Sequence, residues 1–195
     1  EVGFTGISDE VYDQITFDDA QFTSIAEVRP GFDRFLVVNS FSKTYAMTGW
    51  RCGFVIGSVD LIAPMAFLQE GITSSLPGFV QEAALAAIEG PQTDVDMMVQ
   101  SYAQRRDLIT ERIAGIAGIS MLRPEATFYA FANIKDWGLT SWEAATALLE
   151  NHGLATIPGS AFGAQGEGYL RLTFSVAPET INTACDRIAD FAATR

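Results

Sequence analysis

An apolar run and a polar loop follow one another in residues 35–51, FLVVNSFSKTYAMTGWR. The unbroken apolar run, Phe35 to Val38, is typical of a strand that is buried on both faces of a parallel sheet. In open α/β sheets, ligands bind beyond the carboxyl ends of the strands, so chemistry is expected in the polar residues after Val38. The stretch therefore indicates an α/β fold with a functional loop after this strand.

The loop contains Lys43, and the only other lysine of the chain is Lys135. A lysine amine can form a Schiff base with an aldehyde. Arg51 can hold a phosphate beside it by two parallel hydrogen bonds, and Ser40 by one. The alternative interpretation is an exposed loop with a solvated lysine, because charged residues mostly lie at the surface.

A second candidate site is the segment DEVY, residues 9–12, at the end of another expected strand. The Asp9 carboxylate can pair with a protonated ring nitrogen, and the Tyr12 phenol can donate a hydrogen bond to an oxygen on the same ring. The alternative is an ordinary turn with an acidic residue and a half-buried tyrosine.

A third candidate is Arg171, which interrupts an alternating strand in residues 169–174, YLRLTF. A guanidinium among apolar residues needs an anion, and a substrate carboxylate matches its two-pronged geometry. The alternative is an arginine on the exposed face of the strand.

The composition argues against nucleic acid and anionic membranes as partners. The 195 residues carry a formal net charge of -12, with a pI of about 4.3, so phosphates would be repelled. A small-molecule ligand fits better. Cys52 and Cys185 lie far apart, without other cysteines or histidines at metal-ligand spacing, so we expect reduced thiols in a cytoplasmic protein, with no disulfide and no metal.

The pattern of expected elements changes near residue 118. Before it we expect a strand at residues 35–38, two further strands of the same kind ending at Glu10 and Ile56, and helices that begin at Asp60 (interrupted near Pro64), Phe79 and Thr93. After it the units are shorter, with strands at residues 127–131, 154–157 and 169–174, and helices opened by a Thr140–Glu143 capping box and by Pro178. Two domains, 1–118 and 119–195, follow from this, the second a small α+β domain joined to the first by a long helix.

The order and spacing of these segments resemble the fold-type I, aspartate-aminotransferase-like enzymes of class I/II, which use pyridoxal phosphate (PLP). SFSKTYAMTGWRCGF is similar to the family's lysine signature, DEVY to its pyridine-nitrogen motif, PGSAFG to the turn before its last functional strand, and GEGYLRLTFS to its carboxylate-binding segment. One segment, Pro124 to Tyr129, departs from the pattern. It has Ala126 where the family usually has a glycine, so a different local turn is expected.

The resemblance implies the carboxyl-terminal half of such an enzyme. Residues 1–118 would form the end of the large PLP-binding domain, a mostly parallel sheet flanked by helices, together with the long interdomain helix. The implied activity is transfer of an amino group between an amino acid and a 2-oxo acid, with PLP bound as an imine on the catalytic Lys43. The other implied roles are a pairing with the ring nitrogen for Asp9, a bond to the ring hydroxyl for Tyr12, phosphate binding for Ser40 and Arg51, and substrate α-carboxylate binding for Arg171.

Two other functions stay open at this point. One is a ligand-sensor domain of a transcriptional regulator, which would need a basic DNA-binding segment upstream; the other is a PLP-dependent lyase, because one cofactor site can run several reactions. The resemblance also implies a homodimer, an amino-terminal half upstream of Glu1, and no activity for the fragment alone. The sequence does not specify which amino acid is the donor and which oxo acid the acceptor.

Overall fold

The computed structural model describes residues 4–31 and 33–195. By packing, the chain divides into two compact units, Glu1–Met97 and Met98–Arg195, so that the division lies within helix α5 (Thr93–Ala114). The sequence pattern puts the boundary later, after residue 118. The difference has a physical reason: the buried residues of α5, Arg106, Ile109 and Ile113, all belong to its carboxyl-terminal part and pack within the second unit.

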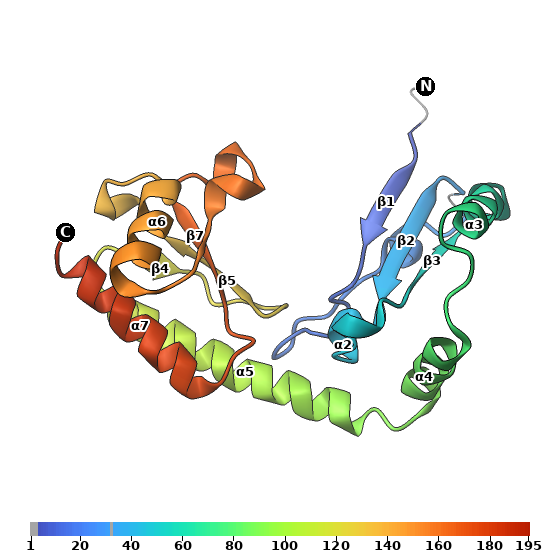
Figure 1. Ribbon diagram of the computed structural model, residues 1–195, viewed down its shortest axis with the longest axis horizontal. Helices are drawn as coiled ribbons and strands as arrows, with labels where there is room; N and C mark the ends of the chain where they lie inside the picture. Colours follow the sequence, from blue (N-terminus) through green and yellow to red (C-terminus); the bar gives the residue numbers. More distant parts are fainter. Residues whose placement is uncertain (1–3, 32) are drawn as a thin grey trace. The chain divides into compact units, whose positions relative to one another are not determined.

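The first unit contains a three-stranded sheet in which β2 (Phe35–Ser40) is central (Figure 1). The neighbouring β1 (Gly6–Asp9) runs parallel to β2, and Leu36 and Val37 are buried, which confirms the prediction for this apolar run. The third strand, β3 (Gly53–Gly57), is antiparallel, so the expectation of a third parallel strand is wrong. Residue Ser40 pairs directly with Gly53, so residues 41–52, which include two short helices, return the chain to the end of β2 that it left and make no crossover to the other end, which parallel pairing requires.

Short helices occupy the loops around this sheet, and two longer ones follow it. The short ones are α1 (Ile25–Val28), α2 (Phe41–Thr44) and the 3-10 turn η1 (Thr48–Trp50); the longer ones are α3 (Val59–Thr73) and α4 (Gly78–Glu89). Helix α3 continues through Pro64, so the expected interruption there is wrong. Proline lacks an N–H donor, so the bond from position 64 to the carbonyl of Asp60 cannot form, and the helix continues with one backbone bond fewer.

The second unit is built on a four-stranded antiparallel sheet with the order β4 (Ser120–Met121), β5 (Tyr129–Asn133), β7 (Tyr169–Thr173) and β6 (Ile157–Pro158). Its helices are α6 (Ser141–His152), α7 (Pro178–Ala192) and the part of α5 that belongs to this unit, with 3-10 turns η2 (Lys135–Trp137), η3 (Gly159–Phe162) and η4 (Ala164–Gly166). This is the small α+β arrangement that the sequence predicts.

The two faces of this second sheet differ in kind. On one face Ala130, Ala132, Leu170 and Leu172 are buried, and they form a core with apolar residues of the three helices, among them Ile109, Leu148, Ile181 and Ile188. Because side chains alternate along a strand, the neighbouring residues Phe131 and Arg171, which pair across β5 and β7, point to the opposite face. That face carries the candidate substrate-binding arginine.

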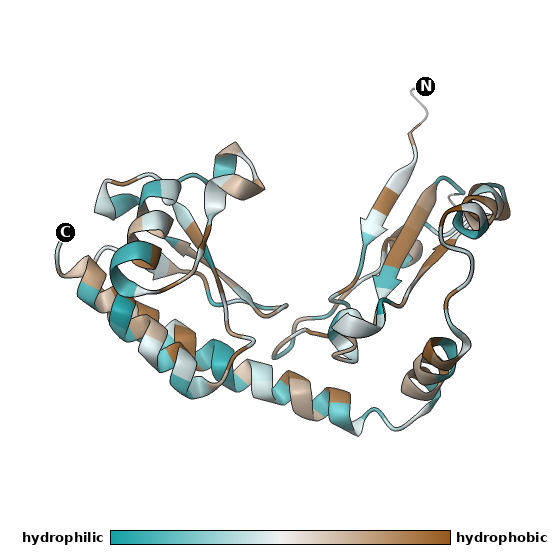
Figure 2. Ribbon diagram, viewed as in Figure 1, coloured by the Kyte–Doolittle hydropathy of each residue, from teal (hydrophilic) through white to brown (hydrophobic). Residues whose placement is uncertain are grey.

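Helices α3 and α4 expose large apolar side chains within the first unit. The most exposed are Val59, Phe67, Ile72 and Phe79, and Figure 2 shows hydrophobic residues along both helices. Apolar patches of this kind usually mark a surface that another chain or segment covers. Among the described helices, none combines the length and the apolar character needed to span a membrane.

Candidate functional site

Three predicted site residues gather at one edge of the first sheet. Asp9 ends β1 and Ser40 ends β2, and these parallel strands are in register, with Asp9 opposite Val38. Arg51 comes two residues before Gly53, the residue of β3 that pairs with Ser40. The carboxyl ends of two parallel strands and the entry to the antiparallel strand therefore meet at the edge where the fold class predicts a ligand.

Lys43 lies on α2, which begins directly after β2. Ser40 caps this helix, because its side-chain oxygen accepts a hydrogen bond from the Ser42 backbone N–H at 3.1 Å. The Lys43 Nζ atom lies 5.9 Å from the centre of the Tyr12 ring. The structure thus brings together the amine and the phenol that the sequence assigns to one cofactor.

The two candidate phosphate ligands already have partners on the chain. The Ser40 hydroxyl lies 2.9 Å from the Ser42 hydroxyl and 3.0 Å from the Cys52 carbonyl. Arg51 is exposed, with left-handed backbone (φ 54°), and one guanidinium nitrogen donates to the Thr48 carbonyl at 2.9 Å. Since a guanidinium has five N–H donors, most of the Arg51 fork remains available for an anion.

Asp9 is exposed, and one of its carboxylate oxygens accepts a hydrogen bond from the Val11 N–H at 3.3 Å. Its neighbour Glu10 is buried instead and accepts hydrogen bonds from the Ser8 hydroxyl and the Ile25 N–H. The two adjacent acids therefore differ in role: Glu10 holds the loop together, and Asp9 leaves an oxygen for a ligand.

Arg171 belongs to the second unit, where aromatic rings flank it. Its guanidinium carbon lies 4.3 Å from the centre of the Tyr129 ring and 4.5 Å from that of Phe162. No hydrogen bond or ion pair joins the Arg171 guanidinium to any residue that the structure describes. Rings can contact a guanidinium on its faces while the N–H edges stay available to an anion.

Close backbone contacts hold Phe162 in its turn. The backbones of Gly159 and Gly166 approach so closely that a Cβ on either would clash with the carbonyl oxygen of the other. The segment Pro124–Tyr129, which departs from the family pattern, has its positive φ at Thr127 (67°) and not at Ala126. The left-handed residue of this turn is therefore Thr127, two residues before Tyr129.

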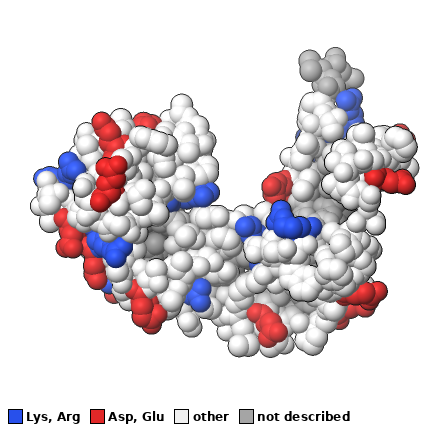
Figure 3. Space-filling model, viewed as in Figure 1, with Lys and Arg blue, Asp and Glu red and all other residues white. Residues whose placement is uncertain are grey.

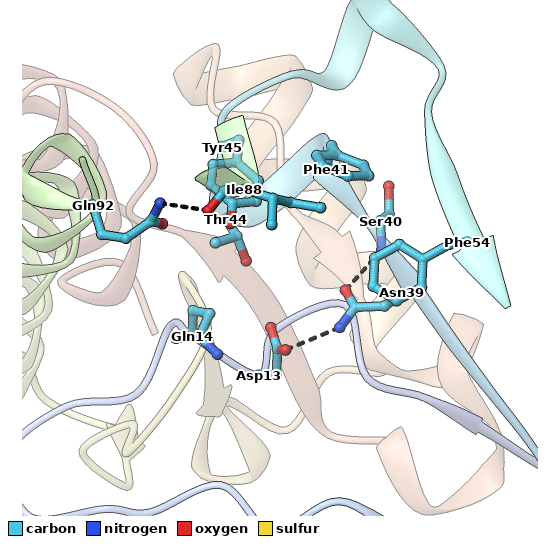
Figure 4. A pocket seen from close by; sticks show the side chains of 10 residues that line it. All are labelled: Asp13, Gln14, Asn39, Ser40, Phe41, Thr44, Tyr45, Phe54, Ile88 and Gln92. Carbon is cyan, nitrogen blue, oxygen red and sulfur yellow. Dashed lines mark hydrogen bonds between the residues drawn. The ribbon is translucent and has the colours of Figure 1, made fainter. Parts of the chain in front are cut away.

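Sequence reasoning missed two sets of contacts. Asn39 bridges β2 and the loop after β1, and it lines a cavity of about 260 Å³ (Figure 4). Tyr129 and Phe162 flank Arg171. Asn39 is a polar residue directly after the apolar run, and this signal could have indicated its contacts. The contacts of Arg171 with the two rings could be found only from the pairing of the strands.

Other nucleophiles and metal ligands offer no rival site in the described part of the chain. Cys52 and Cys185 are buried free thiols, and burial raises the pKa of the Cys185 thiol, which disfavours the reactive thiolate near neutral pH. No cluster of histidine, cysteine or carboxylate side chains suited to a metal ion occurs among the described residues.

Comparison with known proteins agrees with this fold and shows the family. The family model for aminotransferase class I and II matches residues 3–188, and the chain belongs to this family. It is 40% identical to an aspartate aminotransferase of Pyrococcus abyssi (93% of this chain, 47% of the relative) and 38% identical to an arginine–pyruvate transaminase of Pseudomonas aeruginosa (94% and 46%).

A solved aromatic aminotransferase from Pyrococcus horikoshii superposes with a TM-score of 0.93 at 38% identity, over 97% of this chain and 51% of that structure. The chain thus spans about half the length of the relatives that it matches. Members of the family use pyridoxal phosphate.

Proposed function

We propose that this chain carries the pyridoxal-phosphate site of an aminotransferase, which transfers an amino group between an amino acid and a 2-oxo acid. The observation that carries the proposal is the position of the Lys43 amine, 5.9 Å from the centre of the Tyr12 ring, at the sheet edge shared by Asp9, Ser40 and Arg51. Each of these groups matches one part of the cofactor, and the family membership supports the same chemistry.

The donor set fits PLP group by group. The Lys43 amine suits its aldehyde, the Asp9 carboxylate a protonated ring nitrogen, and the Tyr12 phenol the ring oxygen. The Arg51 fork and the Ser40 hydroxyl suit the phosphate, once the Ser40 proton turns away from Ser42 and Cys52. When bound, the cofactor supplies an aldehyde and a ring that accepts electrons from the substrate.

The residues of the chain do the rest of the work in this proposal. Lys43 Nζ removes and returns the proton at the substrate α-carbon. Asp9 keeps a proton on the ring nitrogen by accepting its hydrogen bond. Arg171, held between two rings and without an anion among the described residues, binds and orients the substrate carboxylate.

Amino donors labelled with heavy nitrogen test the proposal and separate it from its alternatives. The PLP-loaded protein, here and in the tests below, is this chain completed to the full length of its relatives. It is incubated with labelled amino acids and a panel of 2-oxo acids, and the products are identified by mass spectrometry. Label in a new amino acid is the expected result. Label released as ammonia would instead indicate a lyase, and binding without any transfer would indicate a sensor.

We further propose that the protein is a homodimer of the cytoplasm. The exposed apolar side chains of α3 and α4 support a protein-covered surface, and the two free thiols suit a reducing compartment. The acidic composition argues against nucleic acid, and in Figure 3 Lys and Arg side chains occur in small separate groups on the visible face. Sedimentation of the PLP-loaded protein at two concentrations tests the dimer.

A further inference from the structure

One side chain, Asn39, joins the loop that carries Tyr12 to the end of β2, directly before the helix that carries Lys43. Its Nδ2 donates a hydrogen bond to the Asp13 carboxylate at 2.9 Å, and its Oδ1 accepts one from the Ser40 N–H at 2.7 Å (Figure 4). Both partners belong to the proposed site or adjoin it. Asp13 directly follows Tyr12, and Ser40 is itself a candidate phosphate ligand. The amide therefore contacts the loop after β1 and the end of β2 at once.

The bridge lies beyond the last paired residues of the two strands. The ladder between β1 and β2 ends at Asp9 and Val38, and one further backbone bond joins the Glu10 N–H to the Val38 carbonyl at 2.8 Å. The chain then turns, with the Asp13 N–H bonded to the Glu10 carbonyl at 3.0 Å. Past that point, the bond between Asn39 and Asp13 ties the end of this turn to β2.

We propose that Asn39 is a positioning residue that, through Asp13, sets where the Tyr12 phenol stands relative to Lys43. The proposal rests on the function proposed above. Displacements of about 1 Å in a reacting or cofactor-binding group can cost large factors in rate, so a bond that fixes this turn matters for the chemistry. A polar bridge that only stabilised the fold would change stability and leave the cofactor's electronic properties unaltered.

The pair allows a swap that keeps both hydrogen bonds. Asn39→Asp alone sets two carboxylates against each other and breaks the bridge. Adding Asp13→Asn restores it with donor and acceptor exchanged, because the carboxylate at position 39 still accepts from the Ser40 N–H. Gln14→Glu is the matched control, since Gln14 is exposed, lines the same cavity, and would add a charge next to the pair without breaking it.

The readouts, taken on the PLP-loaded protein, are the pH midpoint of the cofactor's visible absorbance and the dissociation constant for PLP. A phenol that donates a hydrogen bond to the ring oxygen stabilises the deprotonated, negatively charged form of that oxygen. This favours loss of the proton that the absorbance reports, so misplacing Tyr12 in Asn39→Asp should raise the pH midpoint by about one unit. We expect PLP affinity to fall about tenfold. The double variant should have the pH midpoint and the dissociation constant of the wild type, and Gln14→Glu should change neither value.

The contrary outcomes are distinct. An unchanged midpoint in Asn39→Asp, an equal shift in Gln14→Glu, or a double variant that stays shifted would each overturn the positioning role. Urea unfolding of each variant shows whether the fold is intact; should Asn39→Asp unfold, Asn39→Ala, which introduces no charge, must show the same shift. A wild-type protein that forms no visible band with PLP would contradict the proposed function itself, whereas a normal wild-type band with unresponsive variants contradicts only the role of Asn39.

Discussion

Arg171 shows how one side chain can be prepared for a ligand by its neighbours. It is half-buried on strand β7, its guanidinium carbon lies over the rings of Tyr129 and Phe162, and no described residue supplies it with an anion. Contact with two rings limits the motion of the guanidinium and so reduces the entropy lost when a carboxylate binds. The charge and the geometry both call for a planar anion.

Replacing Arg171 by lysine should therefore weaken substrate binding and catalysis together. In steady-state kinetics of the PLP-loaded protein, Arg171→Lys should raise KM, lower kcat, and reduce kcat/KM by about a hundredfold, because an ammonium cannot reproduce the two-pronged contact. Arg195→Lys is the matched control, since Arg195 also lies over a ring, that of Phe191 at 4.5 Å. Lost PLP affinity with normal kinetics at saturating cofactor would mean that Arg171 holds the phosphate instead.

Single residues were predictable where their chemistry is local. Lys43, Ser40 and Arg51 lie within one stretch of sequence, and a buried strand before a polar loop identifies that stretch. Asn39 and Phe162 were not predictable in this way, because the partner of Asn39, Asp13, is 26 residues away and Phe162, in the turn η3, contacts Arg171 on strand β7. The pairing of elements, and not the local pattern, determines those contacts.

The start of helix α6 is the clearest case of an element specified by its own sequence. The predicted capping box is confirmed, with Thr140 as N-cap and Glu143 bonded back to it. A second carboxylate, Glu167, comes from the segment before β7 and accepts hydrogen bonds from the Ser141 N–H at 2.6 Å and the Ser141 hydroxyl at 3.1 Å. These hydrogen bonds, chiefly the one from the Ser141 N–H, hold the pKa of Glu167 below its usual value of 4.5.

The lowered pKa of Glu167 predicts a pH-dependent stabilisation. Because the pKa of Glu167 is lower in the folded protein than in the unfolded chain, its contribution to the free energy of unfolding is fully present above pH 4.5. The contribution is lost as the pH falls through the folded pKa. Glu167→Gln should thus lower the free energy of unfolding in urea near neutral pH and have a smaller effect near pH 3. Glu150→Gln is the control, because Glu150 is exposed on helix α6, and this change should alter the free energy of unfolding little at either pH. Equal losses of stability for Glu167→Gln at both pH values would contradict the prediction.

Other elements show where local patterns mislead. The run at residues 53–57 is typical of a buried strand, yet Phe54 and Ile56 are exposed, and the direction of the strand depends on the end of β2 to which residues 41–52 return, which hydrophobicity does not encode. Pro64 predicts a break in α3, yet the helix continues with one backbone bond fewer. The presence of these two elements was predictable; the direction and burial of the strand and the continuity of the helix were not.

At the scale of the molecule, the first unit leaves surfaces uncovered. Both β1 and β3 are edges of its sheet, and Phe54 and Ile56 on β3 are exposed, as are large apolar residues of α3. Unpaired edges and apolar faces favour association with other polypeptide. The chain spans about half the length of its relatives, which agrees with a need for further chain to complete the site.

We therefore predict that residues 1–195 alone bind PLP weakly and give no measurable transamination. Absorbance titration with PLP followed by a coupled assay with several amino donors measures both properties. Activity should appear when the remaining half of a family member's length is supplied, joined or as a separate fragment. Tight stoichiometric binding with turnover by residues 1–195 would contradict the prediction.

The central claim, that Lys43 holds the cofactor, has one direct measurement. The protein is incubated with PLP, reduced with borohydride, digested, and mapped by mass spectrometry. The account predicts a pyridoxyl label on the peptide that contains Lys43 and none on the peptide that contains Lys135, the only other lysine. A label on Lys135, or reduction that leaves Lys43 unmodified at saturating PLP, would contradict it.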